Sequence, residues 1–190
     1  MKRPAEPGPG RIRIIGGSLR GSRLEVPVAI GLRPTPDRLR ETLFNWLMPW
    51  MVGARCLDLF AGTGALGIEA LSRQVGSVVF VERDPALVSA LRANLARLKV
   101  MAYVVQASAL SWLQGAAQPF DIVFVDPPFA DGLWLPTIAA LERADWLSVN
   151  ALIYLESPAD VVPAVPAHWG VWREARVGAV RGALYRRSAV

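Results

Sequence analysis

Four consecutive residues, Asp126-Pro127-Pro128-Phe129, combine groups that suit a planar ring bearing an amine. They follow the apolar run at 120–125, a pattern that predicts a buried strand ended by a stiff loop. The Asp126 carboxylate accepts hydrogen bonds, and the proline after it keeps Asp126 out of the helical region. The Asp126 carboxylate and the backbone carbonyl oxygens after it could hold the NH2 group of such a ring, for example a nucleic-acid base, while the ring stacks on Phe129. Without a cofactor site elsewhere in the chain, the same residues would indicate only a structural turn.

The candidate cofactor site is a glycine-rich segment that follows an earlier predicted strand. Gly62, Gly64 and Gly67 let the backbone turn sharply and approach a ligand, and the helix after them begins with free N–H groups. These glycines also match the dinucleotide fingerprint G-x-G-x-x-G, and Glu82 lies 20 residues after Gly62, where a ribose-binding acid is expected. An NAD-dependent oxidoreductase is therefore an alternative.

The tetrad Asp126-Pro127-Pro128-Phe129 resembles the (Asp/Asn/Ser)-Pro-Pro-(Tyr/Phe) motif of S-adenosylmethionine-dependent methyltransferases that modify exocyclic amino nitrogens. Asp58, four residues before Gly62, is similar to the acidic residue of their first motif, which faces the positively charged methionine end of the cofactor. A pyrophosphate would be repelled at that carboxylate. The oxidoreductase alternative also assigns no function to the tetrad, and it has only one histidine, His168, as a candidate acid-base group. We therefore favour S-adenosylmethionine as the cofactor.

Alternating strands and helices place both motifs at the ends of strands. The pattern predicts strands at 56–60, 77–82, 102–106, 120–125 and 151–156, with helices at 65–73, 84–98, 133–143 and a short one from about 109. This order implies a parallel, doubly wound sheet, and 171–177 with 182–187 predict a closing antiparallel hairpin. The expected fold is the α/β, Rossmann-like class I S-adenosylmethionine-dependent methyltransferase fold, with a mostly parallel seven-stranded sheet.

The N-terminal part predicts a separate small extension. Residues 11–15 and 23–26 alternate as a β-hairpin with arginines on one face. A helix should follow, with Thr35 as its N-cap and its end before Pro49, and we expect Trp46 and Trp50 in the core. We therefore divide the chain into a flexible tail (1–10), an RNA-binding extension (11–50) and the methyltransferase domain (51–190).

Composition limits the classes of protein that the chain can belong to. Its 190 residues suit one main core, and 53% hydrophobic against 19% charged residues excludes a disordered chain. The sequence has no stretch suited to crossing a membrane and no secretory signal, so we expect a soluble, cytoplasmic protein. Cys56, the single cysteine, fits an inert core thiol, and His168 fits a surface loop, so we expect no metal site.

Positive charge is concentrated at the two ends of the chain. The net charge is +5, and residues 1–40 hold nine Lys and Arg against three acidic residues, while residues 171–190 hold five against one. Nineteen of the 21 cations are arginine, whose planar fork suits phosphate. This segregation favours a polyanionic partner, most simply a nucleic acid.

Four segments together resemble the bacterial 16S ribosomal RNA guanine-N2 methyltransferase family of the D type. They are Arg13 to Gly17, Leu32 to Leu47, the glycine-rich segment, and Val123 to Phe129. The resemblance covers nearly the whole chain from Arg11. It implies methylation of the exocyclic N2 of a guanine, of the guanine(966) type, in 16S rRNA. It also implies that the partner is the small ribosomal subunit or its assembly intermediate, and we expect a monomer that needs no metal.

The resemblance also implies roles for individual residues. Catalysis falls to Asp126, Pro127, Pro128 and Phe129. The chain departs from the family pattern after its third strand, where Ser108 and Ala109 replace an aspartate that binds adenine. The cofactor-binding residues implied are Arg33, Thr35, Asp58, Phe60, Ala61, Gly62, Thr63, Gly64, Glu82, Arg83, Ser108 and Ala109, and the candidate RNA-binding residues are Arg11, Arg13, Arg20 and Arg23.

Two other functions remain open at this stage. An adenine-N6 methyltransferase acting on DNA or RNA would hold its target amine in the same way. A non-catalytic RNA-binding assembly factor could retain the fold without the reaction, although the presence of Asp58, Glu82 and Asp126 counts against it.

Overall fold

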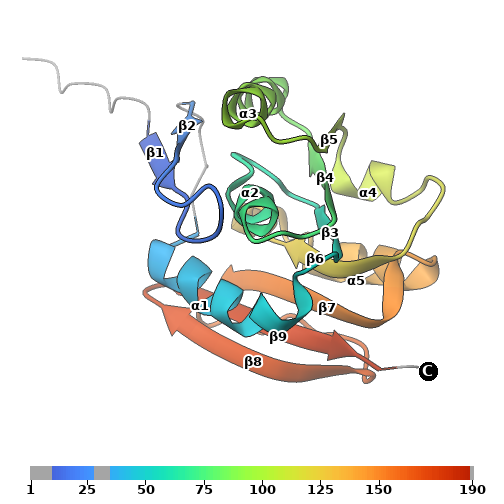
Figure 1. The fold of residues 1–190 in the computed structure, drawn as a ribbon. Coiled ribbons are helices and arrows are strands. Elements are labelled where there is room, and N and C mark those ends of the chain that lie inside the picture. The colour runs from blue at the N-terminus through green and yellow to red at the C-terminus, as the bar shows by residue number, and fades with distance from the viewer. Residues whose placement is uncertain (1–9, 28–34, 189–190) are drawn as a thin grey trace, which may run out of the picture.

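A seven-stranded sheet forms the centre of the molecule (Figure 1), which a computed structural model describes for residues 10–27 and 35–188. The strand order is β5-β4-β3-β6-β7-β9-β8, parallel from β5 to β7 and antiparallel in the β7-β9 and β9-β8 pairs. The strands are β3 (Arg55–Asp58), β4 (Ser77–Glu82), β5 (Tyr103–Gln106), β6 (Phe120–Val125), β7 (Leu147–Pro158), β8 (Trp169–Val177) and β9 (Val180–Arg187).

Helices cover both faces of this sheet, as the alternating pattern predicts. Side chains of α1 (Asp37–Leu47), α2 (Ala65–Ser72) and α3 (Pro85–Leu98) pack in one core, and those of α4 (Ala109–Trp112) and α5 (Trp134–Arg143) pack in another. Successive strand residues alternate between the two cores, so that Cys56 belongs to the first and Leu57 to the second. The doubly wound, mostly parallel seven-stranded α/β architecture expected from the sequence, with its antiparallel C-terminal hairpin, is confirmed.

The N-terminal hairpin is the expected extension to this fold. Strands β1 (Gly10–Arg13) and β2 (Arg23–Val26) pair in an antiparallel manner, with Ile12 opposite Leu24. Both of these side chains are buried, which leaves the arginines on the exposed face. Figure 1 shows the hairpin beside α2 and above α1.

A buried carboxylate fastens the hairpin to the main domain. Glu69 on α2 is 0% exposed, and its two oxygens accept the backbone N–H groups of Ile15 and Gly16, each at 2.8 Å. Arg73 Nε donates to the same carboxylate at 2.9 Å, while the buried Arg40 on α1 donates to the Arg13 carbonyl at 2.9 Å. Because these donors and acceptors are out of water, their pairing holds the hairpin in one position.

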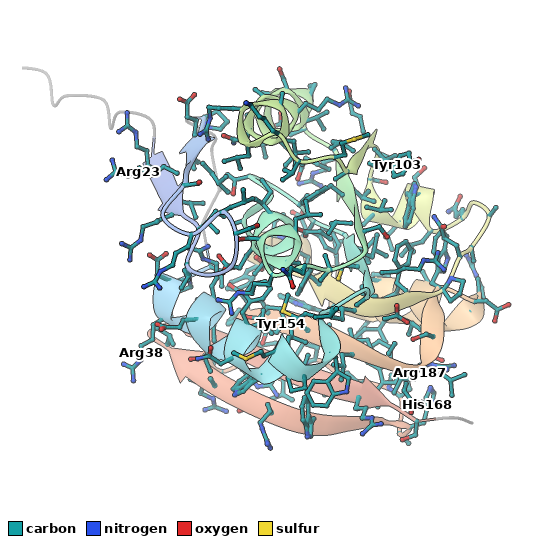
Figure 2. All side chains as sticks on the ribbon, in the orientation of Figure 1. Arg23, Arg38, Tyr103, Tyr154, His168 and Arg187 are labelled. Carbon is teal, nitrogen blue, oxygen red and sulfur yellow. The ribbon has the colours of Figure 1, made fainter. Side chains whose placement is uncertain are left out.

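The C-terminal hairpin has its own anchor on α5. Glu142 accepts hydrogen bonds from the Trp169 indole at 2.7 Å and from Arg187 Nε at 2.9 Å, and it lies 3.0 Å from His168 Nε2. Figure 2 shows His168 and Arg187 close to the end of the chain. His168 is thus a half-buried partner of Glu142, and it does not line the cavity described below.

Several expectations about the elements are wrong in detail. Thr35 does not cap α1: Pro36 holds the N-cap position with no side-chain cap, and the Thr35 hydroxyl donates to Asp126 instead. Trp50 is 39% exposed and packs edge-to-face on Trp172, with ring centroids 4.5 Å apart, so it is not a core residue. Strand β7 begins four residues earlier than expected, because Leu147 already pairs with Phe120 of β6, ahead of an irregularity in the register.

Three expectations about the remaining elements can be compared directly. The strand expected at 56–60 ends at Asp58, where the chain turns into the glycine-rich loop. Burial raises the pKa of Cys56, which is 0% exposed, so the thiol is an inert core group as predicted. None of the helices in the described ranges is long and apolar enough to cross a membrane.

Candidate active site

Four carboxylates lie at the carboxyl ends of four adjacent parallel strands. Asp58 and Glu82 are the last residues of β3 and β4, Asp126 directly follows β6, and Glu156 lies near the end of β7. In each strand the residue two positions earlier, Cys56, Phe80, Phe124 or Tyr154, belongs to the core that α1, α2 and α3 cover. Because side chains alternate along a strand, all four carboxylates project toward that same face of the sheet.

A cavity of about 690 Å³ opens at this edge of the sheet. All four carboxylates line it, and they come with both candidate motifs: the glycine-rich loop on one side and the tetrad on the other. Apolar residues form much of the remaining wall, including Leu59, Leu66 and Leu87. Carboxyl ends of parallel strands are where open α/β sheets bind ligands, and an acidic wall at that place favours a ligand with positive charge or N–H donors.

The loop after β3 can take its shape only because of its glycines. Gly62 and Gly64 have φ values of +52° and +79°, which side chains rarely adopt. A Cβ on Gly64 would also lie 2.3 Å from Leu91 Cδ1, and one on Gly67 would lie 2.2 Å from Phe80. Gly62 thus lines the cavity, Gly64 lets the loop pack closely on α3, and Gly67 lets α2 pack closely on β4.

Asp58 is held under this loop by the start of α2. Its Oδ2 accepts the Gly67 backbone N–H at 3.0 Å, and the residue is 2% exposed. Burial raises the pKa of Asp58 to about 7, with the nearby Glu82 carboxylate adding to the rise and the Gly67 hydrogen bond opposing it. A cation entering the cavity would favour the ionised form of this side chain.

Glu82 fixes two backbone segments around the cavity. Its Oε2 accepts the N–H of Gly62 at 2.8 Å, and its Oε1 accepts the N–H of Asp84 at 2.8 Å. Each carboxylate oxygen has a second lone pair, so both can still accept a hydroxyl of a ligand. Glu82 therefore joins the glycine-rich loop to the start of α3 and keeps acceptors available beside the cavity.

The four residues of the tetrad, which follows β6, differ in burial. Pro127 is buried and Pro128 exposed, whereas Asp126 and Phe129 are half-buried on the cavity wall. The Thr35 hydroxyl lies 3.5 Å from Asp126 Oδ2, a long hydrogen bond that brings the segment before α1 to the cavity. Burial, then the charges of Glu156 and Asp58, raise the pKa of Asp126 well above its ordinary value, while the Thr35 hydroxyl opposes that rise.

The far end of the cavity carries Ser108 and Ala109, which the sequence offers in place of an aspartate. Ser108 is the N-cap of α4, and its Oγ accepts the Ser111 N–H at 3.2 Å. The hydroxyl proton of Ser108 is thus the group best suited to contact a ligand. At the mouth, Arg83 and Asp131 form an ion pair at 2.9 Å that joins the loop after β4 to the segment after the tetrad.

The structure brings most of the predicted site residues together. Every candidate cofactor and catalytic residue that it describes lines the cavity except Gly64, whose neighbours Thr63 and Ala65 do, and Arg33 lies outside the described residues. Arg11, Arg13, Arg20 and Arg23 are exposed on the N-terminal hairpin and do not line the cavity. Within the described ranges, no group of three or more His, Cys, Asp and Glu side chains is arranged to hold a metal ion.

Sequence reasoning missed Glu156 as a cavity residue. It is 2% exposed, and Tyr154 donates to its Oε2 at 3.0 Å. A signal was available, because an acidic residue ends the apolar run Ala151 to Leu155, just as Asp126 ends the run at 120–125.

Comparisons with known proteins agree on one family. The model of the family named Conserved hypothetical protein 95 matches residues 12–186. Ribosomal RNA small subunit methyltransferase D of Escherichia coli strain K12 is 52% identical over 100% of this chain and 96% of its own length. The protein of the same name from Haemophilus influenzae is 46% identical over 93% of this chain and 94% of its own length.

Solved structures give the same result for the fold. That of the Escherichia coli protein yhhF has a TM-score of 0.87 at 53% identity and covers 95% of this chain and 100% of its own. The 16S rRNA N2 methyltransferase RsmC of Thermus thermophilus, solved with AdoMet and guanosine, has a TM-score of 0.68 at 24% identity and covers 97% of this chain and 52% of its own. The latter similarity concerns the fold alone.

The raised pKa of Asp58 predicts a particular pH dependence of stability. Between the ordinary pKa of 3.8 and about 7, the folded protein keeps a proton on Asp58 that the unfolded chain has lost. The free energy of unfolding should therefore fall as pH rises through this range, by at most about 1.4 kcal/mol per pH unit, and this contribution should level off above pH 7. The Asp58→Asn variant, which keeps an oxygen for the Gly67 N–H, should lack that contribution.

Guanidinium unfolding of both proteins from pH 4.5 to 8 measures the difference. The variant should gain stability relative to the natural protein as pH rises to 7. Asp145→Asn, at an exposed position, is the control and should follow the natural protein. Parallel curves for Asp58→Asn and the natural protein would show that Asp58 ionises normally.

Proposed function

The chain belongs to the Conserved hypothetical protein 95 family and, within it, to the ribosomal RNA small subunit methyltransferase D group. From that membership we propose that it transfers a methyl group from S-adenosylmethionine to the exocyclic N2 of a guanine in 16S rRNA. One observation carries the proposal: the Asp-Pro-Pro-Phe tetrad and the glycine-rich loop share one acidic cavity. The first provides acceptors for an amine, and the second provides a site for a methyl donor.

The residues of the cavity fit the charges of S-adenosylmethionine. The Asp58 carboxylate suits its positively charged methionine end, and Glu82 suits the two ribose hydroxyls. The positive φ values of Gly62 and Gly64 give the loop the sharp turn that lets its backbone follow the ligand. Phe60, Ala61 and Thr63 complete this wall. We assign Arg83, Ser108 and Ala109 to the adenine end and Thr35 to the methionine end. The resemblance assigns Arg33, outside the described residues, to the methionine end as well.

The cofactor supplies a methyl group bonded to a sulfonium, which is a strong electrophile. The protein must therefore activate the amine, because the lone pair of guanine N2 is delocalised into the ring. Asp126 and the Pro127 carbonyl accept the two N–H groups and direct the lone pair toward the methyl carbon, while Phe129 stacks on the base. As the N–C bond forms, the bond between the methyl group and sulfur would break and leave a neutral thioether. N2 then carries the positive charge, which Asp126 stabilises and relieves by taking a proton.

The raised pKa of Asp126 suits this role. A carboxylate in an acidic, buried wall binds a proton more strongly than one in water, so it is a better acceptor for the proton that N2 loses. The proton can pass to water through the open mouth of the cavity after the methylated base leaves. No other group is needed to complete the proton balance.

The exposed arginines of the N-terminal hairpin suit the backbone of the RNA. Arg11, Arg13 and Arg23 lie on the exposed face of the hairpin, and Figure 2 shows Arg23 pointing away from the body of the molecule. The buried anchor at Glu69 holds this face in a fixed position relative to the cavity. We therefore assign residues 11–50 to RNA binding and 51–190 to methyl transfer.

The decisive test is transfer of labelled methyl groups from S-adenosylmethionine to purified small subunits and to naked 16S rRNA, followed by nucleoside analysis. Label in N2-methylguanosine is the expected result. The better of the two substrates shows whether the exposed arginines of the N-terminal hairpin recognise the assembled subunit or the RNA alone. Label in N6-methyladenosine would keep the site but change the base. Tight cofactor binding without any transfer would favour a binding role.

Asp126→Ala should abolish most of the transfer while leaving the cofactor bound. The variant loses both an acceptor for the amine and the proton acceptor, which together account for a fall in kcat of about 10²- to 10⁴-fold. The dissociation constant for S-adenosylmethionine, measured by calorimetry, should change little. Asp145→Ala, at an exposed position, is the matched control, and normal turnover of Asp126→Ala would remove the proposed role.

The double variant Arg13→Ala, Arg23→Ala tests the RNA-binding face. It should raise KM for the RNA substrate and reduce the dependence of log affinity on log salt by about one for each lost phosphate contact, with kcat nearly unchanged. Arg143→Ala, an exposed arginine on α5, is the control. An unchanged salt dependence of the double variant would show that the hairpin does not contact RNA.

A further inference from the structure

Glu156 lies next to Asp126 in the sheet. Strands β6 and β7 pair in parallel, with Phe124 opposite Tyr154 and Val125 opposite Leu155. Continued by one residue beyond β6, the same register brings Asp126 beside Glu156, at the spacing of neighbouring strands of about 4.8 Å. The Glu156 charge acts on Asp126, which agrees with this placement. Both side chains project to the same face of the sheet, and both line the cavity. The tetrad thus presents its amine acceptor together with a second carboxylate.

The surroundings of Glu156 hold it in a defined position. The Tyr154 hydroxyl, itself buried, donates to Glu156 Oε2 at 3.0 Å, and the Trp134 indole donates to the Glu156 backbone carbonyl at 2.7 Å. Gly182 on β9 leaves room for this arrangement, because a Cβ there would lie 2.5 Å from the Tyr154 hydroxyl. Two elements besides β7 therefore fix where this carboxylate lies.

The proposed transfer uses a single amine, which Asp126 and the Pro127 carbonyl already satisfy. The edge of guanine nevertheless carries another donor, since its ring N1–H is adjacent to the N2 amine. Adenine differs at this point, because its N1 carries a lone pair and no proton. A carboxylate directed at N1 therefore attracts guanine and repels adenine.

We propose, on the basis of the function above, that Glu156 accepts the N1–H of the target guanine beside Asp126 and thereby selects guanine over bases whose amine is adjacent to an unprotonated ring nitrogen. The two carboxylates then bind the two adjacent donor groups of one base. Asp126 serves the reaction, and Glu156 serves the choice of base.

The charges in the cavity agree with this assignment. Two carboxylates side by side repel each other, and after burial the Glu156 charge is the largest cause of the raised pKa of Asp126. A base that donates to both relieves this repulsion. A base with a lone pair at N1 would add a third acceptor to the same place, next to two carboxylates that already repel each other.

Glu156 could instead serve only to accept the Tyr154 hydroxyl, and base analogues distinguish the two roles. Small subunits are reconstituted with 16S rRNA in which the nucleotide that the natural enzyme methylates is guanosine or 2-aminopurine. The analogue keeps the N2 amine but has a lone pair at N1. The kcat/KM for methyl transfer is measured on both substrates with the natural protein and with Glu156→Gln.

The natural protein should prefer guanosine by about 100-fold or more, because a site built around a donor rejects the analogue that lacks it. Glu156→Gln keeps an oxygen for the Tyr154 hydroxyl and offers an N–H toward the base, so the preference should fall by at least about tenfold. 2-Aminopurine also lacks the O6 of guanine. This loss affects the natural protein and the variant alike, so it cancels when their two preferences are compared as a ratio. Asp145→Asn is the matched control and should keep the natural preference.

Two results would overturn the assignment. Equal preferences in the natural protein and in Glu156→Gln would show that Glu156 does not contact N1. Efficient transfer to 2-aminopurine by the natural protein would show the same without any variant, so the test does not depend on the folding of Glu156→Gln. Absence of transfer to guanosine by the natural protein would instead overturn the proposed function itself, and the two failures are therefore distinguishable.

Discussion

The repulsion among four carboxylates at one edge of a parallel sheet is the constraint on which the rest of the site depends. Adjacent strands that run in the same direction bring their carboxyl ends together, and Asp58, Glu82, Asp126 and Glu156 end four neighbours in that sheet. Burial and mutual repulsion raise the pKa values of Asp58 and Asp126. Such a cavity is costly when empty, and it favours ligands that bring a positive charge or several N–H donors.

The proposed substrates are both of this kind. A sulfonium cofactor brings positive charge, and the edge of guanine brings adjacent N–H groups. In the proposed complex the carboxylates divide between them in strand order, with those of β4 and β3 assigned to the side of the cofactor and those of β6 and β7 to the side of the base. The glycine-rich loop lies on the first side and the tetrad on the second, so the boundary between the two ligands falls between β3 and β6, where the strand order reverses.

The N-terminal hairpin is attached to this fold by buried polar groups as well as by apolar side chains that join the first core. Glu69 satisfies two backbone N–H groups of the loop between β1 and β2, and Arg40 satisfies a carbonyl at the end of β1. Buried hydrogen bonds stabilise the attachment only in one geometry, whereas apolar contacts tolerate small shifts of the hairpin. The arrangement therefore gives the exposed arginines a fixed distance and direction from the cavity, which suits the RNA-binding role proposed for them.

The sequence by itself determined the order and type of the elements, the glycine-rich loop, the tetrad and the family, because each of these depends on residues close together in the chain. Hydrophobic periodicity located the parallel strands within a few residues, and the basic hairpin was found in the same way. Only the tertiary structure decided the partners of Thr35, Glu69 and Glu156. Asp126 and Glu156 are 30 positions apart, and the register of two strands, which forms when the whole sheet forms, is what sets them side by side.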